Sequence, residues 1–225
     1  MKRALLILII LLTSQFGFTQ TFGGGIFAGL SASQLDGDNW GGYHKAGLSF
    51  GIYTNVMLNK YIDAQMELKY IQKGSSSNSE ELAVFYVSKL NYIELPIFLK
   101  YRFLNKFSAN IGLALGSLQK ATEDKGGYGD EPAFPEFNQF EFSGLVGVEY
   151  KILENLLFNV RFNYSILPVR AHPGDQTYFL NKGQYNNVLT FAVYFQLANP
   201  NNNPYAKRGK KDCDCDNRRK RFSLR

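Results

Sequence analysis

The central stretch of the chain, residues 90–115, alternates apolar and polar side chains at every second position. A period of two is typical of a β-strand, whereas an amphipathic helix repeats every 3.6 residues. One face of residues 92–103 is apolar, while the other carries Glu94, Lys100 and Arg102. After a short turn at 104–106 the alternation resumes. We therefore predict a hairpin whose strands are long enough for a tilted crossing of a bilayer.

The same alternation recurs along the chain and predicts eight strands in total. Besides the central pair, the predicted strands cover residues 23–31, 46–58, 62–70, 140–150, 158–166 and 189–197. The predicted short connections are 59–60, 104–106 and 153–155, and the long ones are 34–44, 74–88, 119–138 and 168–184. Strict alternation of short turns and long loops is typical of an outer-membrane barrel, with long loops outside and short turns in the periplasm.

The predicted fold is therefore all-β, an eight-stranded antiparallel up-and-down transmembrane β-barrel. A soluble lipocalin-like barrel is the alternative, but it would bury its apolar face inward and leave the charges outside. Pro96 is expected to face the lumen and to cause a local bulge, because proline cannot donate to the strand ladder. Aromatic side chains near the predicted strand ends are expected to form interfacial girdles; they are Tyr61, Tyr70, Tyr101, Phe103, Phe107, Tyr150 and Tyr164.

Residues 1–19 have the features of a secretory signal peptide. Lys2 and Arg3 precede an apolar run at 4–12, and the small Gly17 and Thr19 are spaced as a cleavage site. The predicted domain organisation is a signal peptide at 1–19, a barrel at 20–197 and a periplasmic tail at 198–225. An even strand count places both termini in the periplasm and the protein in the cell outer membrane.

The basic character of the chain belongs to its C-terminal tail. The formal net charge is +6, and residues 207–225 hold nine Lys or Arg against three Asp, which accounts for all of it. A segment rich in Pro, Asn and charge with almost no apolar side chains is predicted to be disordered until bound. A periplasmic location excludes nucleic acid as a partner and leaves lipid head groups, cell-wall carboxylates or acidic proteins.

We predict that this tail docks an envelope protein partner, the alternative being a merely solvated tail. The residues expected to attract the partner are Lys207, Arg208, Lys210, Lys211, Arg218, Arg219, Lys220 and Arg221. Cys213 and Cys215 are the only cysteines of the chain. A disulfide, free thiols and a metal shared with a partner all stay open for this pair.

Charged residues collect on the predicted lumen face of the strands. The predicted luminal charge network consists of Asp63, Glu67, Lys69, Glu94, Lys100, Arg102, Glu141, Glu149 and Arg161. An eight-stranded barrel is just filled by its own side chains, so buried charges there must pair or lose several kcal/mol in desolvation. We interpret the set as a mutually paired polar core. Proton or ion conduction and an acid/base site are the alternatives.

Catalytic chemistry has little support in the sequence. An acyltransferase or protease would need a His beside a carboxylate or Ser at the outer rim. His44 and His172 are the only histidines, both in predicted loops, with Asp175 three residues after His172. We therefore expect no enzyme activity, no catalytic or metal site and no cofactor.

Residues 92–101, Y-I-E-L-P-I-F-L-K-Y, resemble a conserved strand of the PorT-like outer-membrane β-barrel proteins common in Bacteroidetes. This resemblance implies an eight-stranded outer-membrane barrel without a shared catalytic motif. The family takes its name from a component of type IX secretion and gliding, so such a role is one possibility. The tail after residue 197 departs from the family pattern. We predict a non-enzymatic anchor or scaffold for an envelope complex; a small-solute or ion pore is the alternative, and a lipid-modifying enzyme or protease a minor one.

Overall fold

The structure is a computed structural model that describes residues 22–38, 41–77, 85–104, 106–172 and 183–198. The predicted signal peptide and nearly all of the predicted tail lie outside these residues. Within the described ranges no helix is long and apolar enough to cross a membrane.

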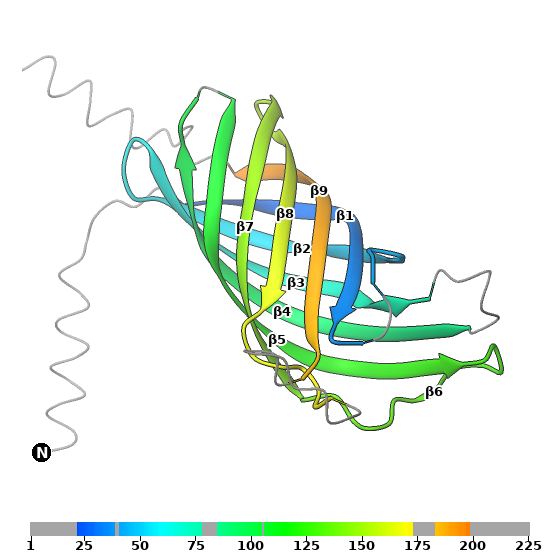
Figure 1. Ribbon diagram of the computed structural model, residues 1–225. Coiled ribbons are helices and arrows are strands. Elements are labelled where there is room, and N and C mark those ends of the chain that lie inside the picture. Colours follow the sequence, from blue (N-terminus) through cyan, green and yellow to red (C-terminus); the bar gives the residue numbers. More distant parts are fainter. Residues whose placement is uncertain (1–21, 39–40, 78–84, 105, 173–182, 199–225) are drawn as a thin grey trace, which may run out of the picture.

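Nine strands form one antiparallel sheet (Figure 1). Their bounds are β1 Phe22–Asp36, β2 Lys45–Met57, β3 Ile62–Ser76, β4 Tyr86–Arg102, β5 Phe107–Lys125, β6 Glu131–Pro132, β7 Phe140–Leu153, β8 Leu156–Ser165 and β9 Tyr185–Ala198. Eight of them pair in the order β1, β2, β3, β4, β5, β7, β8, β9, and β9 pairs with β1, so the sheet closes into a barrel. The short β6 pairs only with the far end of β5. The predicted eight-stranded antiparallel barrel is confirmed.

The two ends of the barrel differ, and we name them by their connections. The short-turn end holds the turns after β2, β4 and β7, together with the start of β1 and the end of β9. The long-loop end holds the connections after β1, β3, β5 and β8. In Figure 1, β4 and β5 reach furthest toward the long-loop end, and β6 lies beside the tip of β5.

Two predicted loops are shorter in the structure because β3, β4 and β5 extend into them. β3 continues to Ser76, β4 begins at Tyr86 and β5 continues to Lys125, so the predicted loops 74–88 and 119–138 are wrong at their edges. A bulge explains part of the error. Tyr92 pairs with Leu118 while Asn91 pairs with Lys120, which leaves one extra residue on β5. This shift reverses the inward and outward positions beyond residue 118 and breaks the alternation that sequence reasoning follows.

The bulge predicted at Pro96 is also wrong. Pro96 faces the lumen as expected, but it pairs with Ala114 of β5 without any shift of register. On the β3 side, Glu94 and Ile97 are paired but the two residues between them are not. The register is the same before and after this gap. Because proline lacks only the N–H, the strand loses pairing toward one neighbour and keeps it toward the other.

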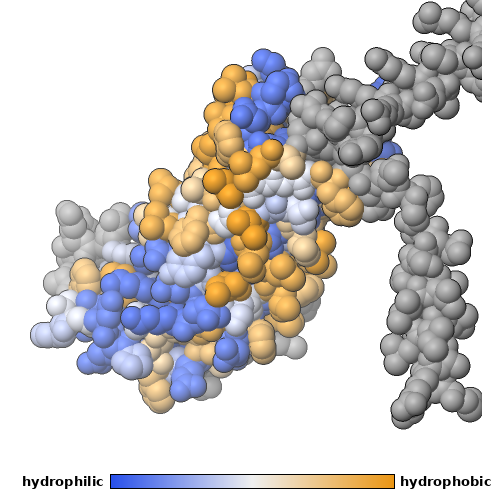
Figure 2. Space-filling view, turned by 180° about the vertical axis from the view of Figure 1, so that it is seen from behind, coloured by the Kyte–Doolittle hydropathy of each residue, from blue (hydrophilic) through white to orange (hydrophobic). Residues whose placement is uncertain are grey.

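The outer wall of the barrel is apolar, as the alternation predicts. Large apolar side chains stay exposed along every barrel strand; examples are Leu30, Ile52, Leu68, Ile97, Ile111, Val148, Phe158 and Phe191. Figure 2 shows apolar side chains gathered over the outer wall beside a hydrophilic region. An apolar surface that extends over every barrel strand is unfavourable in water, whereas it suits contact with lipid chains.

Aromatic side chains gather at the short-turn end. The rings of Phe103 and Phe107 lie 6.3 Å apart, and Phe107 lies 4.9 Å from Tyr150. Tyr61 and Tyr101 are half-exposed nearby. These are positions at which an interfacial girdle would meet the head groups.

The long-loop end of the lumen holds an apolar core that sequence reasoning missed. Strand residues Leu35, Ile71, Leu90, Tyr92 and Val188 pack there with Ala133, Phe137 and Val169 from the connecting segments. All eight side chains are buried. The connections after β5 and β8 therefore fold back over this mouth of the barrel.

Candidate functional site

The middle of the lumen is crossed by a cluster centred on Glu67 of β3. The guanidinium of Arg161, on β8, donates to both carboxylate oxygens of Glu67 at 2.8 and 3.1 Å. The Tyr194 hydroxyl and the Gln65 amide each donate to Glu67 at 2.9 Å. The Arg161 guanidinium also lies 4.4 Å from the centre of the Phe98 ring. All five side chains are buried, and they join β3, β4, β8 and β9 across the barrel.

A second cluster lies between this layer and the long-loop end. Glu94 forms ion pairs with Lys69, at 2.7 Å, and with Lys73. Lys73 continues to Glu141 at 2.7 Å, and the Asn186 amide donates to Glu141 at 2.6 Å. These groups are buried as well. Lys73 therefore bridges two carboxylates that belong to β4 and β7.

A third cluster lies toward the short-turn end. Lys100 pairs with Glu149 at 2.7 Å and also donates to the amide oxygen of Gln65 at 3.0 Å, which links this cluster to the middle layer. Arg102 pairs with Asp63 at 2.8 Å.

The structure places all nine residues of the predicted luminal network in the lumen and gives each an ion-pair partner. Lys73 was missed, although it continues the inward positions of Lys69 and Ile71 by two residues. Sequence reasoning ended this strand at Tyr70 and therefore did not count Lys73 among the luminal residues. With Lys73 included, the network holds five acids and five bases, so its formal charges balance.

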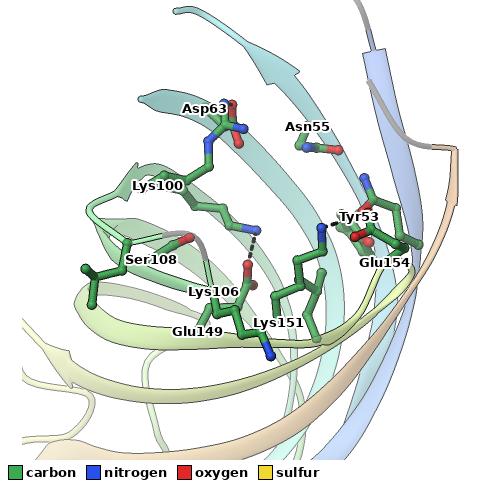
Figure 3. A pocket seen from close by; sticks show the side chains of 13 residues that line it. Tyr53, Asn55, Asp63, Lys100, Lys106, Ser108, Glu149, Lys151 and Glu154 are labelled. Carbon is green, nitrogen blue, oxygen red and sulfur yellow. Dashed lines mark hydrogen bonds and ion pairs between the residues drawn. The ribbon is translucent and has the colours of Figure 1, made fainter. Parts of the chain in front are cut away.

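A cavity of about 140 Å³ lies at the short-turn end, next to the third cluster (Figure 3). Asp63, Lys100 and Glu149 line its inner part, while Lys106 and Glu154 come from the turns at its mouth. Figure 3 shows these side chains around the space, with the pairs Lys100–Glu149 and Lys151–Glu154 drawn as contacts.

Another buried ion pair lies at the long-loop mouth. Its two residues belong to segments that sequence reasoning assigned to loops. Arg170 pairs with Glu123 and lies 4.0 Å from the ring centre of Phe137. The Glu123 carboxylate also accepts from the Tyr86 hydroxyl at 2.8 Å and pairs with Lys125 at 2.9 Å. Burial alone would raise the pKa of Glu123, but the hydrogen bonds from Lys125, Arg170 and Tyr86 outweigh burial and hold the pKa below its ordinary value.

The histidines do not form a described catalytic arrangement. His44 is exposed in the connection after β1, and His172 lies beside Gly37. Its predicted neighbour Asp175 lies outside the described residues, as do Cys213, Cys215 and the basic tail residues. In the described part of the chain, no group of three or more His, Cys, Asp or Glu side chains is arranged to hold a metal ion.

A family model described as outer membrane protein beta-barrel domain matches residues 14–169. Among solved structures, the chain is similar to neisserial surface protein A, with 16% identity, coverage of 78% of this chain and 96% of that one, and a TM-score of 0.47. It is also similar to Ail, the attachment invasion locus protein of Yersinia pestis, with 12% identity, coverage of 78% and 99%, and a TM-score of 0.46. OprG of Pseudomonas aeruginosa matches with 12% identity, coverage of 79% and 95%, and a TM-score of 0.36. No curated protein sequence matches the chain.

Proposed function

Because this chain belongs to the outer-membrane β-barrel domain family, we propose that it is a non-enzymatic anchor that holds an envelope protein complex at the outer membrane. Its partner contacts lie at the two ends of the barrel and along the tail that follows β9, and both termini face the periplasm. The PorT-like resemblance of residues 92–101 suggests a secretion or gliding complex as one such assembly.

The observation that carries this proposal is the filled lumen. Three clusters of paired charges occupy it from the short-turn end to the long-loop end, and an apolar core closes the long-loop mouth. A barrel filled in this way leaves no room for a solute path, so its ends and outer loops are the surfaces through which it acts. The membrane lipid surrounds the apolar outer wall.

The tail is the second support for an anchoring role. β9 ends at Ala198 at the short-turn end. Nine basic residues follow in the sequence, among them the eight expected to attract the partner, together with Cys213 and Cys215. In the proposed orientation this segment starts at the periplasmic surface. Electrostatic attraction there is worth about 1 kcal/mol per basic residue near an anionic surface, and the cysteines add the capacity for a covalent or metal-mediated link to a partner.

Deletion of residues 201–225 tests the proposal. The truncated barrel should insert and stay heat-modifiable on gels, while the envelope partner that co-purifies with the full chain in mild detergent should be lost. A second variant keeps the chain length and replaces the eight basic residues and both cysteines by Ser. It should lose the partner as well, which would show that the side chains and not the length of the tail are needed. If the truncated protein kept every partner of the full chain, the anchoring role of the tail would be wrong.

A small-solute pore is the second candidate, favoured by the cavity of about 140 Å³ at the short-turn end. Planar-bilayer recording on the purified protein distinguishes the two functions. We expect no reproducible open-channel conductance, since the Glu67 cluster and the apolar core block the path. Steady conductance that increases when Phe137 is replaced by Ala would support the pore instead.

A further inference from the structure

The cavity at the short-turn end is closed on its inner side by apolar side chains. Tyr53 and Leu157 line it, and Leu157 packs against the buried cluster that Tyr53 forms with Phe27, Ala192 and Tyr194. The ring of Tyr194 lies 5.3 Å from Tyr53 and 4.6 Å from Phe27. The cavity is therefore a blind pocket whose inner wall is apolar and partly aromatic.

The volume of the cavity suits one six-membered ring. It measures about 140 Å³, and an apolar protein cavity of about 150 Å³ can hold benzene. A ring that entered would meet Tyr53, and aromatic pairs gain stabilisation beyond the area that they bury. The cavity thus matches an aromatic side chain in size and in the chemistry of its inner wall.

The charged groups of the lining favour an uncharged occupant. Three ion pairs line the cavity, namely Asp63–Arg102, Lys100–Glu149 and Lys151–Glu154. Lys106 is the remaining charged residue of the lining, and it forms no ion pair with any residue that the structure describes. A basic side chain would add to this positive charge, whereas the face of an aromatic ring attracts an ammonium group.

The chain leaves the barrel at the rim of this cavity. Gln196 of β9 lines the cavity, and β9 ends two residues later at Ala198. Residues 199–204 read N-P-N-N-N-P, and Asn and Pro favour turns. Tyr205 follows, and it carries the only large apolar side chain in residues 199–221. The chain between Ala198 and Tyr205 can span up to about 23 Å, so Tyr205 can reach back to the cavity.

We propose that the tail folds back at residues 199–204 and places the ring of Tyr205 in this cavity. The occupant is thus a named segment of the chain itself. The ring covers the wall formed by Tyr53 and Leu157 and lies beside the Lys106 ammonium, while the basic residues from Lys207 onward stay outside the cavity. This contact goes beyond the proposed anchoring function, because it needs no envelope partner.

Labelling of a cysteine in the cavity tests this contact on the purified full chain in detergent. The background carries Cys213→Ser and Cys215→Ser, and Ser108→Cys places a thiol in the lining. Tyr205→Ser should speed the reaction of this thiol with a small maleimide about tenfold, as expected if the ring fills the cavity about nine-tenths of the time. Tyr205→Phe should leave the reaction slow, because it keeps the ring.

Two matched controls separate the contact from general effects. Lys60→Cys places a thiol at another short turn that does not line the cavity, and its labelling rate should not depend on Tyr205. Phe222→Ser removes the other aromatic side chain of the tail and should leave the labelling of Ser108→Cys slow. Heat-modifiability on gels checks that each variant is folded.

Disulfide formation keeps the inference testable if Ser108→Cys does not fold. In the same background, Leu157→Cys with Tyr205→Cys should form an intramolecular disulfide when copper–phenanthroline is added, whereas Leu157→Cys with Phe222→Cys should not. The inference is overturned if Tyr205→Ser leaves the labelling rate of Ser108→Cys unchanged, which would place the ring in the lipid interface or in solvent. It is also overturned if Tyr205→Phe or Phe222→Ser speeds labelling as much as Tyr205→Ser, or if the two cysteine pairs oxidise equally.

Discussion

Arg161 and Glu67 stand 94 residues apart in the chain, yet the guanidinium of Arg161 holds both carboxylate oxygens of Glu67 across the lumen at 2.8 and 3.1 Å. Two-point contact of this kind fixes the mutual orientation of β8 and β3 as well as their distance. Because both side chains are buried, neither charge has water as an alternative partner. Loss of either group would therefore leave the other as an unpaired buried charge.

Replacement of Arg161 by Met should destabilise the barrel by about 3–5 kcal/mol, because Glu67 would keep a buried charge without a counter-ion. Urea-dependent unfolding from lipid vesicles measures this loss. The double variant Arg161→Met with Glu67→Gln should recover much of the stability, since it leaves no unpaired charge. Lys60→Met, at an exposed turn, serves as the control. A double variant no more stable than Arg161→Met alone would show that the ion pair is not the cause.

Lowering the pH should destabilise the long-loop mouth, because it protonates Glu123. Contacts from Lys125, Arg170 and Tyr86 hold its pKa below the ordinary value of 4.5. These contacts therefore contribute stability that is complete above pH 4.5 and is lost as the pH falls through the lower folded pKa. Hydrogen exchange in the segments around Phe137 and Val169, corrected for the intrinsic rate, should therefore become faster over the range from neutral pH down to below 4.5. Glu123→Gln should already exchange fast at neutral pH and lose the pH dependence. A wild-type protein with the same protection at both ends of that range would contradict the assignment.

Gly29 leaves no room for a side chain, because a Cβ there would lie 2.1 Å from the backbone oxygen of Phe191. Backbone oxygens cannot move aside without breaking the β1–β9 ladder. Gly29→Val should therefore prevent closure of the barrel, and the protein should lose its heat-modifiable folded form on gels. Ala28→Val is the matched control, since Ala28 is the neighbouring outward-facing residue and is exposed. Equal folding of the two variants would show that β1 tolerates a bulky inward residue.

The proposed orientation of the barrel predicts which end antibodies reach. An epitope tag in the connection between Ser76 and Tyr86 should be labelled on intact cells, because that connection belongs to the long-loop end. A tag at the turn formed by Asn59 and Lys60 should be labelled only after the outer membrane is opened. Both insertions leave the strand ladders intact, so heat-modifiability confirms folding in each case. Labelling in the reverse pattern would invert the proposed topology.

The sequence alone determined which face of each strand meets lipid and which meets the lumen. Side chains alternate with a period of two, so a run such as Ile93, Leu95, Ile97 on one face and Glu94, Lys100 on the other fixes the faces without any knowledge of neighbours. The same pattern gave the number of strands and the alternation of short turns with long loops. It also placed nine charged residues in the lumen, because the face on which a side chain lies depends only on whether its position in the strand is odd or even.

Only the tertiary structure decided which charges meet. Glu67 has Lys69 two residues away, but its own partner is Arg161, and Lys73 reaches Glu141 on the distant β7. Those contacts depend on barrel closure and on the stagger of strands that are far apart in sequence, which no local period encodes. The extra residue on β5 beyond Leu118 reverses the parity there, so the pair of Glu123 with Arg170 and the apolar core around Phe137 were hidden within segments that sequence reasoning assigned to loops.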